Sequence, residues 1–196
     1  MIKHVKHTIL TEAAKEAYED KERAIRLYTE SLNYDSIHWR HISPKAMEED
    51  PEKFLKFYNR IEERVGKETP VVYIWEAVDP ISEKEKLQHA KVKSRVGYTT
   101  PSLRKDYQNA DVMYIGSKLK NANSRIGQHL IGRNVYKRTN ELGIECQNTC
   151  LKLSKWYEGR VNLTIIPLPG CSKAGITHVE EHLKDANKFM FGRKEN

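Results

Sequence analysis

The stretch from residue 111 to residue 131 constrains the fold most, because it predicts a strand followed directly by a helix. Its first part holds the apolar run Val112 to Ile115, which a polar residue precedes and Gly116 closes. A short apolar run bounded in this way is typical of a strand. The predicted strand carries Tyr114.

The second part of the stretch predicts a helix. Arg125 and His129 stand four residues apart on one face of it, so their side chains project side by side. The candidates for the N-cap are Asn121, Asn123 and Ser124. The apolar residues Ile126, Leu130 and Ile131 are spaced so that they bury a different face of the helix.

Three elements of this stretch resemble the second half of a GIY-YIG nuclease module. They are Y-I-G at 114–116, Arg125 eleven residues after Tyr114, and Q-H-L at 128–130. In that family a tyrosine-bearing hairpin, an arginine on the next helix and a distant glutamate surround one divalent metal at a phosphodiester. The alternative is a core tyrosine at a strand edge and a solvated Arg/His face on a helix.

The resemblance places the first tyrosine of the family on the strand predicted at 71–78. The family's G-I-Y-like triplet is Val71-Val72-Tyr73 here, so the glycine is missing while the tyrosine is present. Val96-Gly97-Tyr98 is the alternative triplet. Tyr73 is favoured because V-V-Y-I-W-E-A-V is long enough, and rich enough in β-branched and aromatic residues, to pair as a central strand.

The last predicted helix opens at Thr177 and resembles the family's V-E-x-x-L-like turn, which supplies the metal-binding glutamate. The spacing to Leu183 selects Glu180, and Glu181 is the neighbouring alternative. A local explanation competes with both, since Thr177 and Glu180 also fit a T-x-x-E capping box.

The resemblance gives each residue a role at a scissile phosphate. Tyr73 helps to deprotonate a water, which His129 or Tyr114 polarises or orients; Arg125 contacts the phosphate; and Glu180 holds Mg²⁺, with Mn²⁺ as a substitute. A free tyrosine has a pKa near 10, so it acts as a base only where cationic neighbours lower that value.

Charge is unevenly distributed and favours a nucleic-acid partner. The chain carries a net charge of +7; residues 1–66 hold 12 Lys+Arg against 13 Asp+Glu, and residues 67–196 hold 22 against 14. An electropositive body attracts the phosphates of double-stranded DNA. The predicted DNA contacts are Lys91, Lys93, Arg95, Lys118 and Lys120.

A long segment separates the strands predicted at 71–78 and 112–116, whereas hairpin loops usually have about two to five residues. Residues 84–105 within it carry seven Lys+Arg against one acidic residue. We expect a basic loop that follows a DNA backbone; a solvated surface excursion is the alternative.

The predicted fold class is α+β: a small, mainly antiparallel three-stranded sheet at 71–78, 112–116 and 161–168, flanked by helices. Residues 1–66 are expected to form an N-terminal helical subdomain and residues 67–196 the nuclease-like domain. Helices are predicted at 9–32, 51–65 and 149–157. Thr11 is the expected N-cap of the first, while Asp50-Pro51 begins the second and Gly66 ends it. Residues 37–41 and 133–140 are expected to be connections, with His38 and His41 hydrogen-bonded and without a chemical role.

The sequence contains no 18-residue apolar run and no signal-peptide core at its start, so we expect a cytoplasmic protein that does not contact membranes. Cys146, Cys150 and Cys171 lack C-x-x-C spacing and are expected to be thiols. The predicted function is a Mg²⁺-dependent endonuclease that cuts double-stranded DNA at fixed sites, like a type II restriction enzyme. Two alternatives stay open: a structure-specific repair or recombination nuclease, and a catalytically silent nucleic-acid-binding protein. The sequence leaves the recognition site and a homodimeric state open.

Overall fold

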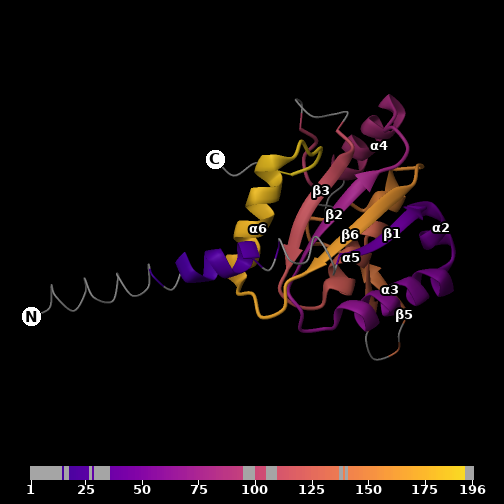
Figure 1. The fold of residues 1–196 in the computed structure, drawn as a ribbon. Helices are drawn as coiled ribbons and strands as arrows, with labels where there is room; N and C mark the ends of the chain where they lie inside the picture. The colour runs from indigo at the N-terminus through magenta and orange to yellow at the C-terminus, as the bar shows by residue number, and fades with distance from the viewer. Residues whose placement is uncertain are drawn as a thin grey trace, which may run out of the picture.

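The computed structural model describes residues 15, 18–26, 28, 36–94, 100–104, 110–136, 139 and 141–192. The described chain has an α+β fold built on a four-stranded sheet in the order β1-β6-β2-β3 (Figure 1). Every neighbouring pair of strands in this sheet is antiparallel. The strands are β1 (Ile37–Ile42), β2 (Val71–Ala77), β3 (Val112–Lys118) and β6 (Val161–Pro167).

Three of these strands confirm the predictions at 71–78, 112–116 and 161–168. The three-strand count was wrong, because β1 pairs with β6 where a connection was expected. The strand is short and polar overall: Ile37 is buried in the core, while His38 bonds Thr164 Oγ1 at 3.0 Å through its Nδ1. His38 is therefore hydrogen-bonded, as expected.

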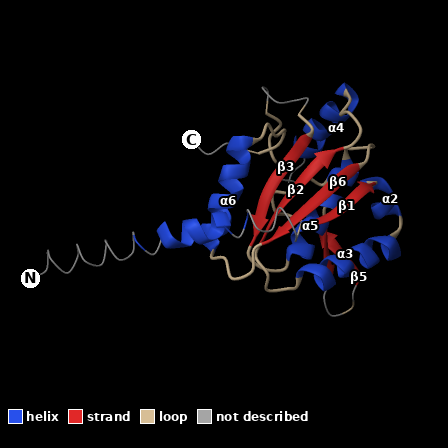
Figure 2. Cartoon of the chain, in the orientation of Figure 1, coloured by secondary structure: helices blue, strands red, loops and turns tan. Residues whose placement is uncertain are grey.

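Helices cover the two faces of the sheet (Figure 2). One face packs against α2 (Pro44–Glu49), α3 (Pro51–Val65) and α5 (Ala122–Ile131), and the other against α6 (Lys173–Ala186). The strand β3 lies at one edge, so both helical layers border it. This edge position lets side chains from opposite faces meet around one strand.

The helix α3 confirms its predicted ends. Asp50 accepts a hydrogen bond from the Lys53 amide at 3.0 Å, Pro51 is the first helical residue, and Gly66 closes the helix with φ 86°. Phe54 and Ile61 on its buried face join the same core as the sheet.

Only part of the helix predicted at 9–32 lies within the described residues. Residues 18–26 are helical, whereas Thr11 lies outside the described residues. Ala24 is buried and faces Gly175 of α6. The described part of this helix therefore packs against α6.

The segment after β2 is not the loop that was expected. It forms the helix α4 (Glu83–Ser94), which carries Lys91 and Lys93. Ser82 and Glu85 cap its start reciprocally, since the Glu85 amide donates to Ser82 Oγ at 3.3 Å and the Ser82 amide to Glu85 Oε2 at 2.7 Å. Residues 95–99, with Arg95 and the alternative tyrosine Tyr98, lie outside the described residues.

Two further predictions were wrong. The connection at 133–140 contains β4 (Arg133–Tyr136), which pairs with β5 (Glu141–Glu145) in a separate two-stranded sheet. The helix at 149–157 is reduced to one short turn, η2 (Leu153–Lys155), because Lys152 before it adopts φ 50°. Within the described ranges, none of the helices combines the length and apolar character that crossing a bilayer requires.

Candidate active site at the edge strand

Two tyrosines lie side by side on the face of the sheet that α5 covers. Tyr73 pairs with Gly116 and Trp75 with Tyr114, so the two phenols are diagonal neighbours across β2 and β3. Their ring centroids are 6.3 Å apart with an interplanar angle of 30°. Tyr73 is only 1% exposed, whereas Tyr114 is half-buried, so Tyr114 is the more accessible of the two tyrosines.

Gly116 leaves the space that both phenols use. A Cβ at this position would lie 2.6 Å from Tyr73 Oη and 2.6 Å from Tyr114 Cε1, which is too close for any side chain. The glycine of the Y-I-G triplet therefore has a steric function here.

His129 is hydrogen-bonded through both ring nitrogens in the protein interior. Its Nε2 lies 3.0 Å from Tyr73 Oη, and its Nδ1 accepts the Leu151 amide at 3.0 Å. Burial and then the charge of Arg125 hold the pKa of His129 well below its ordinary value, so the ring is neutral. Since Nδ1 accepts, the proton is on Nε2, and His129 donates to the Tyr73 oxygen.

The environment of Tyr73 keeps its hydroxyl protonated at neutral pH. Burial, followed by the neighbouring Tyr114, raises the pKa of Tyr73 well above its usual 10.0. The charge and hydrogen bonding of Arg125 act in the opposite direction. Two donors, His129 and Arg125, therefore favour a phenolate at a position where burial opposes it.

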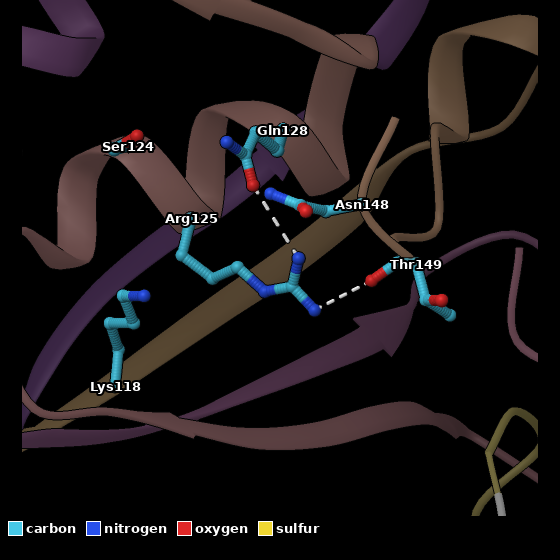
Figure 3. Close-up of a pocket in the computed structure, with 6 residues that line it drawn as sticks. All are labelled: Lys118, Ser124, Arg125, Gln128, Asn148 and Thr149. Carbon is cyan, nitrogen blue, oxygen red and sulfur yellow. Dashed lines mark hydrogen bonds between the residues drawn. The ribbon is translucent and has the colours of Figure 1, made fainter. Parts of the chain in front are cut away.

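Arg125 extends from α5 and is held by a carbonyl and an amide oxygen (Figure 3). Its Nη2 donates to the Thr149 carbonyl at 2.6 Å and its Nη1 to Gln128 Oε1 at 3.4 Å. Gln128 is fixed in turn, because its Nε2 donates to Asn134 Oδ1 at 2.9 Å. The guanidinium therefore has a defined orientation.

A polar cleft of about 370 Å³ opens beside Arg125. Figure 3 shows the guanidinium between Lys118 on one side and Asn148 on the other. Two cationic side chains thus face one hollow, which suits an anionic group. The lining residues are Lys118, Ser124, Arg125, Gln128, Asn148 and Thr149.

Glu180 reaches the same edge strand from the opposite face. Its Oε2 accepts the Ser117 hydroxyl of β3 at 2.5 Å, and its Oε1 accepts Lys184 Nζ at 2.5 Å. Burial is the main cause of the raised pKa of Tyr114; the charge of Glu180 adds to it, and Arg125 and Lys184 oppose it. The Glu180 carboxylate therefore lies within electrostatic range of the two phenols.

The capping-box explanation of Glu180 was wrong. The helix α6 begins at Lys173, and its N-cap is Ser172, whose Oγ accepts the Gly175 amide at 3.1 Å. Thr177 instead bonds the Lys173 carbonyl inside the helix. Glu181, the alternative ligand, faces His178 at 3.8 Å and not β3.

The predicted catalytic residues Tyr73, Tyr114, Arg125, His129 and Glu180 are thus brought together around β3, and Lys118 joins them at the cleft. Of the other predicted DNA contacts that the structure describes, Lys120 follows the end of β3, and Lys91 and Lys93 belong to α4. Lys93, on α4 beyond the end of β2, donates to Ser102 Oγ at 2.7 Å, and Lys120 pairs with Glu68. Lys91 lies on the same helix as Lys93.

Sequence reasoning missed several supporting groups. The Thr149 carbonyl and Leu151 amide are backbone atoms, which no residue pattern reveals. Lys184 was detectable, because it follows Glu180 at the i,i+4 spacing of a helical ion pair.

No group of three or more His, Cys, Asp and Glu residues that could together hold a metal ion gathers in the part of the chain that the structure describes. Among the described residues, Glu180 therefore does not belong to a set of three such ligands. No protein-family model, no curated protein and no solved structure matches this chain.

Proposed function

We propose that this protein is a metal-dependent endonuclease of the GIY-YIG type that hydrolyses phosphodiester bonds in double-stranded DNA at fixed sites. The observation that carries the proposal is the meeting of Tyr73, Tyr114, Arg125, His129 and Glu180 around one edge strand, beside a cationic cleft. Phosphodiester hydrolysis needs an activated water, neutralisation of a phosphorane dianion and stabilisation of the leaving oxygen. These side chains can serve each need.

The reaction involves one water and one phosphodiester. The water oxygen attacks phosphorus, the bond from phosphorus to the leaving oxygen breaks, the water loses one proton, and the leaving oxygen takes one from solvent. Tyr114, the more accessible of the two tyrosines, holds the water, and Tyr73 as a phenolate takes the proton. His129 Nε2–H stabilises that phenolate by donating to its oxygen.

Arg125 is suited to the equatorial oxygens of the phosphate. Its guanidinium is oriented by Thr149 and Gln128 before any substrate arrives, so little reorganisation is needed in the transition state. Lys118, on the far side of the cleft, is placed to pair with a phosphate of the same strand.

Glu180 fits a Mg²⁺ ligand by the chemistry of its donor atoms. A carboxylate offers about four lone-pair positions, of which Ser117 and Lys184 occupy two. Mg²⁺ is commonly bound through one or two carboxylates together with substrate phosphate and water. When bound, the ion would supply positive charge to the leaving oxygen. Mn²⁺, another hard cation, is the expected substitute.

A cleavage assay tests the proposal. Plasmid DNA and a DNA set containing junctions and flaps are incubated with wild-type protein and Mg²⁺, with Arg125→Ala as the matched control. Discrete fragments from the plasmid, absent with the variant and with EDTA, are expected. Cuts confined to junctions or flaps would indicate a repair or recombination nuclease, and binding without any cleavage would indicate a silent DNA-binding protein.

A further inference from the structure

An ion pair lies within the proposed catalytic site, at the carboxylate assigned to the metal. Lys184 and Glu180 are one turn apart on α6, with Nζ and Oε1 2.5 Å from each other. Exposed helical pairs of this spacing contribute little to stability. Here the side chains are only 19% and 17% exposed, so the pair is shielded from solvent.

The carboxylate is constrained on both oxygens. Ser117 of β3 donates to Oε2 while Lys184 donates to Oε1, so the carboxylate is fixed between the edge strand and its own helix. Any second cation that binds Oε1 must share it with an ammonium. Two positive charges at one oxygen repel strongly where water is largely excluded.

We propose that Lys184 is a built-in competitor for the divalent cation at Glu180, and that it gives up Oε1 to the ion and pairs with a DNA phosphate instead. This inference rests on the proposed function. A lysine suits the role because its ammonium is a compact charge on a flexible four-carbon stem, which can change partners without moving the helix. Metal binding is therefore weak without DNA and strengthens when DNA attracts the ammonium away.

The coupling works in both directions. If a DNA phosphate raises the affinity of the Glu180 site for the metal, the metal must raise the affinity for DNA by the same factor. The protein would then avoid holding a loaded ion in the absence of substrate. Replacing Lys184 by an uncharged residue removes both the competition and the coupling.

Calorimetric titration of the full chain with MnCl₂, in the absence of DNA, tests the inference. Lys184→Gln is expected to bind Mn²⁺ about tenfold more tightly than wild type, a difference of about 1.4 kcal/mol. Lys184→Arg, which keeps the charge, should stay close to wild type. Lys173→Gln removes a lysine from the start of the same helix and should also bind as wild type does.

Further arms identify the site and the outcomes that overturn the inference. Glu180→Gln combined with Lys184→Gln must lose the tight binding, which locates the ion at Glu180. Equal or weaker Mn²⁺ binding by Lys184→Gln, in a variant whose thermal melt matches wild type, overturns the inference. Metal-free cleavage that Lys184→Gln abolishes would also overturn it, because the ammonium would then act in place of the ion.

Failure of the proposed function gives a different result. A wild-type protein that cleaves no DNA, together with tighter Mn²⁺ binding by Lys184→Gln, would reject the nuclease and keep the competition at Glu180. Normal metal-dependent cleavage by wild type, together with unchanged Mn²⁺ binding by Lys184→Gln, would keep the nuclease and reject the competition at Glu180.

Discussion

The Tyr73 hydroxyl and His129 Nε2 lie 3.0 Å apart, and the direction of their hydrogen bond is fixed by a third group, the Leu151 amide. Because that amide occupies Nδ1, the neutral ring can only donate to Tyr73. In the proposed mechanism, His129 therefore stabilises a phenolate and does not take the proton of a water.

Replacing His129 by alanine tests this assignment. The variant should lose roughly 30- to 100-fold in single-turnover cleavage rate, the effect of removing one hydrogen bond to a charged oxygen. It should also be less stable by about 1–3 kcal/mol, because the Leu151 amide loses its buried partner. Cleavage and thermal unfolding measure the two effects. A wild-type rate that is already constant at pH 6.5 and above would instead identify a neutral imidazole such as His129 as the general base.

The pH dependence of cleavage follows from the raised pKa of Tyr73. Only the phenolate can accept a proton, and burial, with Tyr114 adding to it, keeps the pKa of Tyr73 above 10.0. The rate should therefore rise about tenfold per pH unit from pH 6.5 to 9, without reaching a plateau. Single-turnover rates at fixed ionic strength check this. A plateau below pH 8 would contradict Tyr73 as the base.

The same shift predicts how folding stability depends on pH, whatever the function. A tyrosine whose pKa is raised in the folded state stabilises the fold fully below pH 10.0, and that contribution is lost as pH rises further. Urea unfolding should show stability falling from about pH 10 upward. Tyr73→Phe should weaken that fall, leaving the part due to other buried tyrosines such as Tyr157, whose pKa burial raises to about 12. An identical fall in both proteins would refute the assignment.

Arg125→Ala should reduce cleavage by about 10³-fold while the protein stays folded, because the guanidinium acts mainly on the transition state. Arg125→Lys is the stricter variant, since a lysine cannot reach Thr149 and Gln128 together while facing a phosphate. We expect it to remain nearly inactive. Circular dichroism and filter binding serve as controls; loss of the fold in either variant would make Arg125 a structural residue.

Gly116→Ala should disturb both phenols. Its added Cβ would lie 2.6 Å from Tyr73 Oη and Tyr114 Cε1, so the rings must shift or β3 must bend. Overpacking of this kind usually costs about 1–3 kcal/mol. Thermal unfolding measures the cost, and Gly127→Ala is a comparison at a looser contact of 3.0 Å to Phe54. A stable variant with normal cleavage would show that the phenol positions are adaptable.

Local sequence signals were sufficient where each element carried its own boundaries. The helix α3 was predicted to the residue because Asp50, Pro51 and Gly66 mark its ends, and β2 because its residues favour strands throughout. The alternation of apolar and polar residues at 37–40 is itself a strand signal, but the run is short and polar overall, so β1 was missed. Its partner β6 lies more than a hundred residues away, and no local pattern shows that pairing.

The candidate site was predictable to the extent that side chains define it. Spacing brought Arg125 beside His129, and the family resemblance added Tyr73 and Glu180. The segment after β5 could not be predicted, because its helical composition is overridden by tertiary bonds. Thr149 and Leu151 give their backbone groups to Arg125 and His129 instead of to a helix.

The segment after β5 should tolerate some substitutions but no insertions or deletions. The Thr149 carbonyl would be supplied by almost any residue, and the Thr149 side chain is exposed, so this position can change. Cys150 and Leu151 are fully buried, so packing restricts their side chains, and position 151 must also keep its amide. The number of residues between Cys146 and Lys152 is not free, because a single insertion or deletion would move both anchors at once. Sequence change over time should therefore replace exposed residues of the segment while keeping its buried residues and its length.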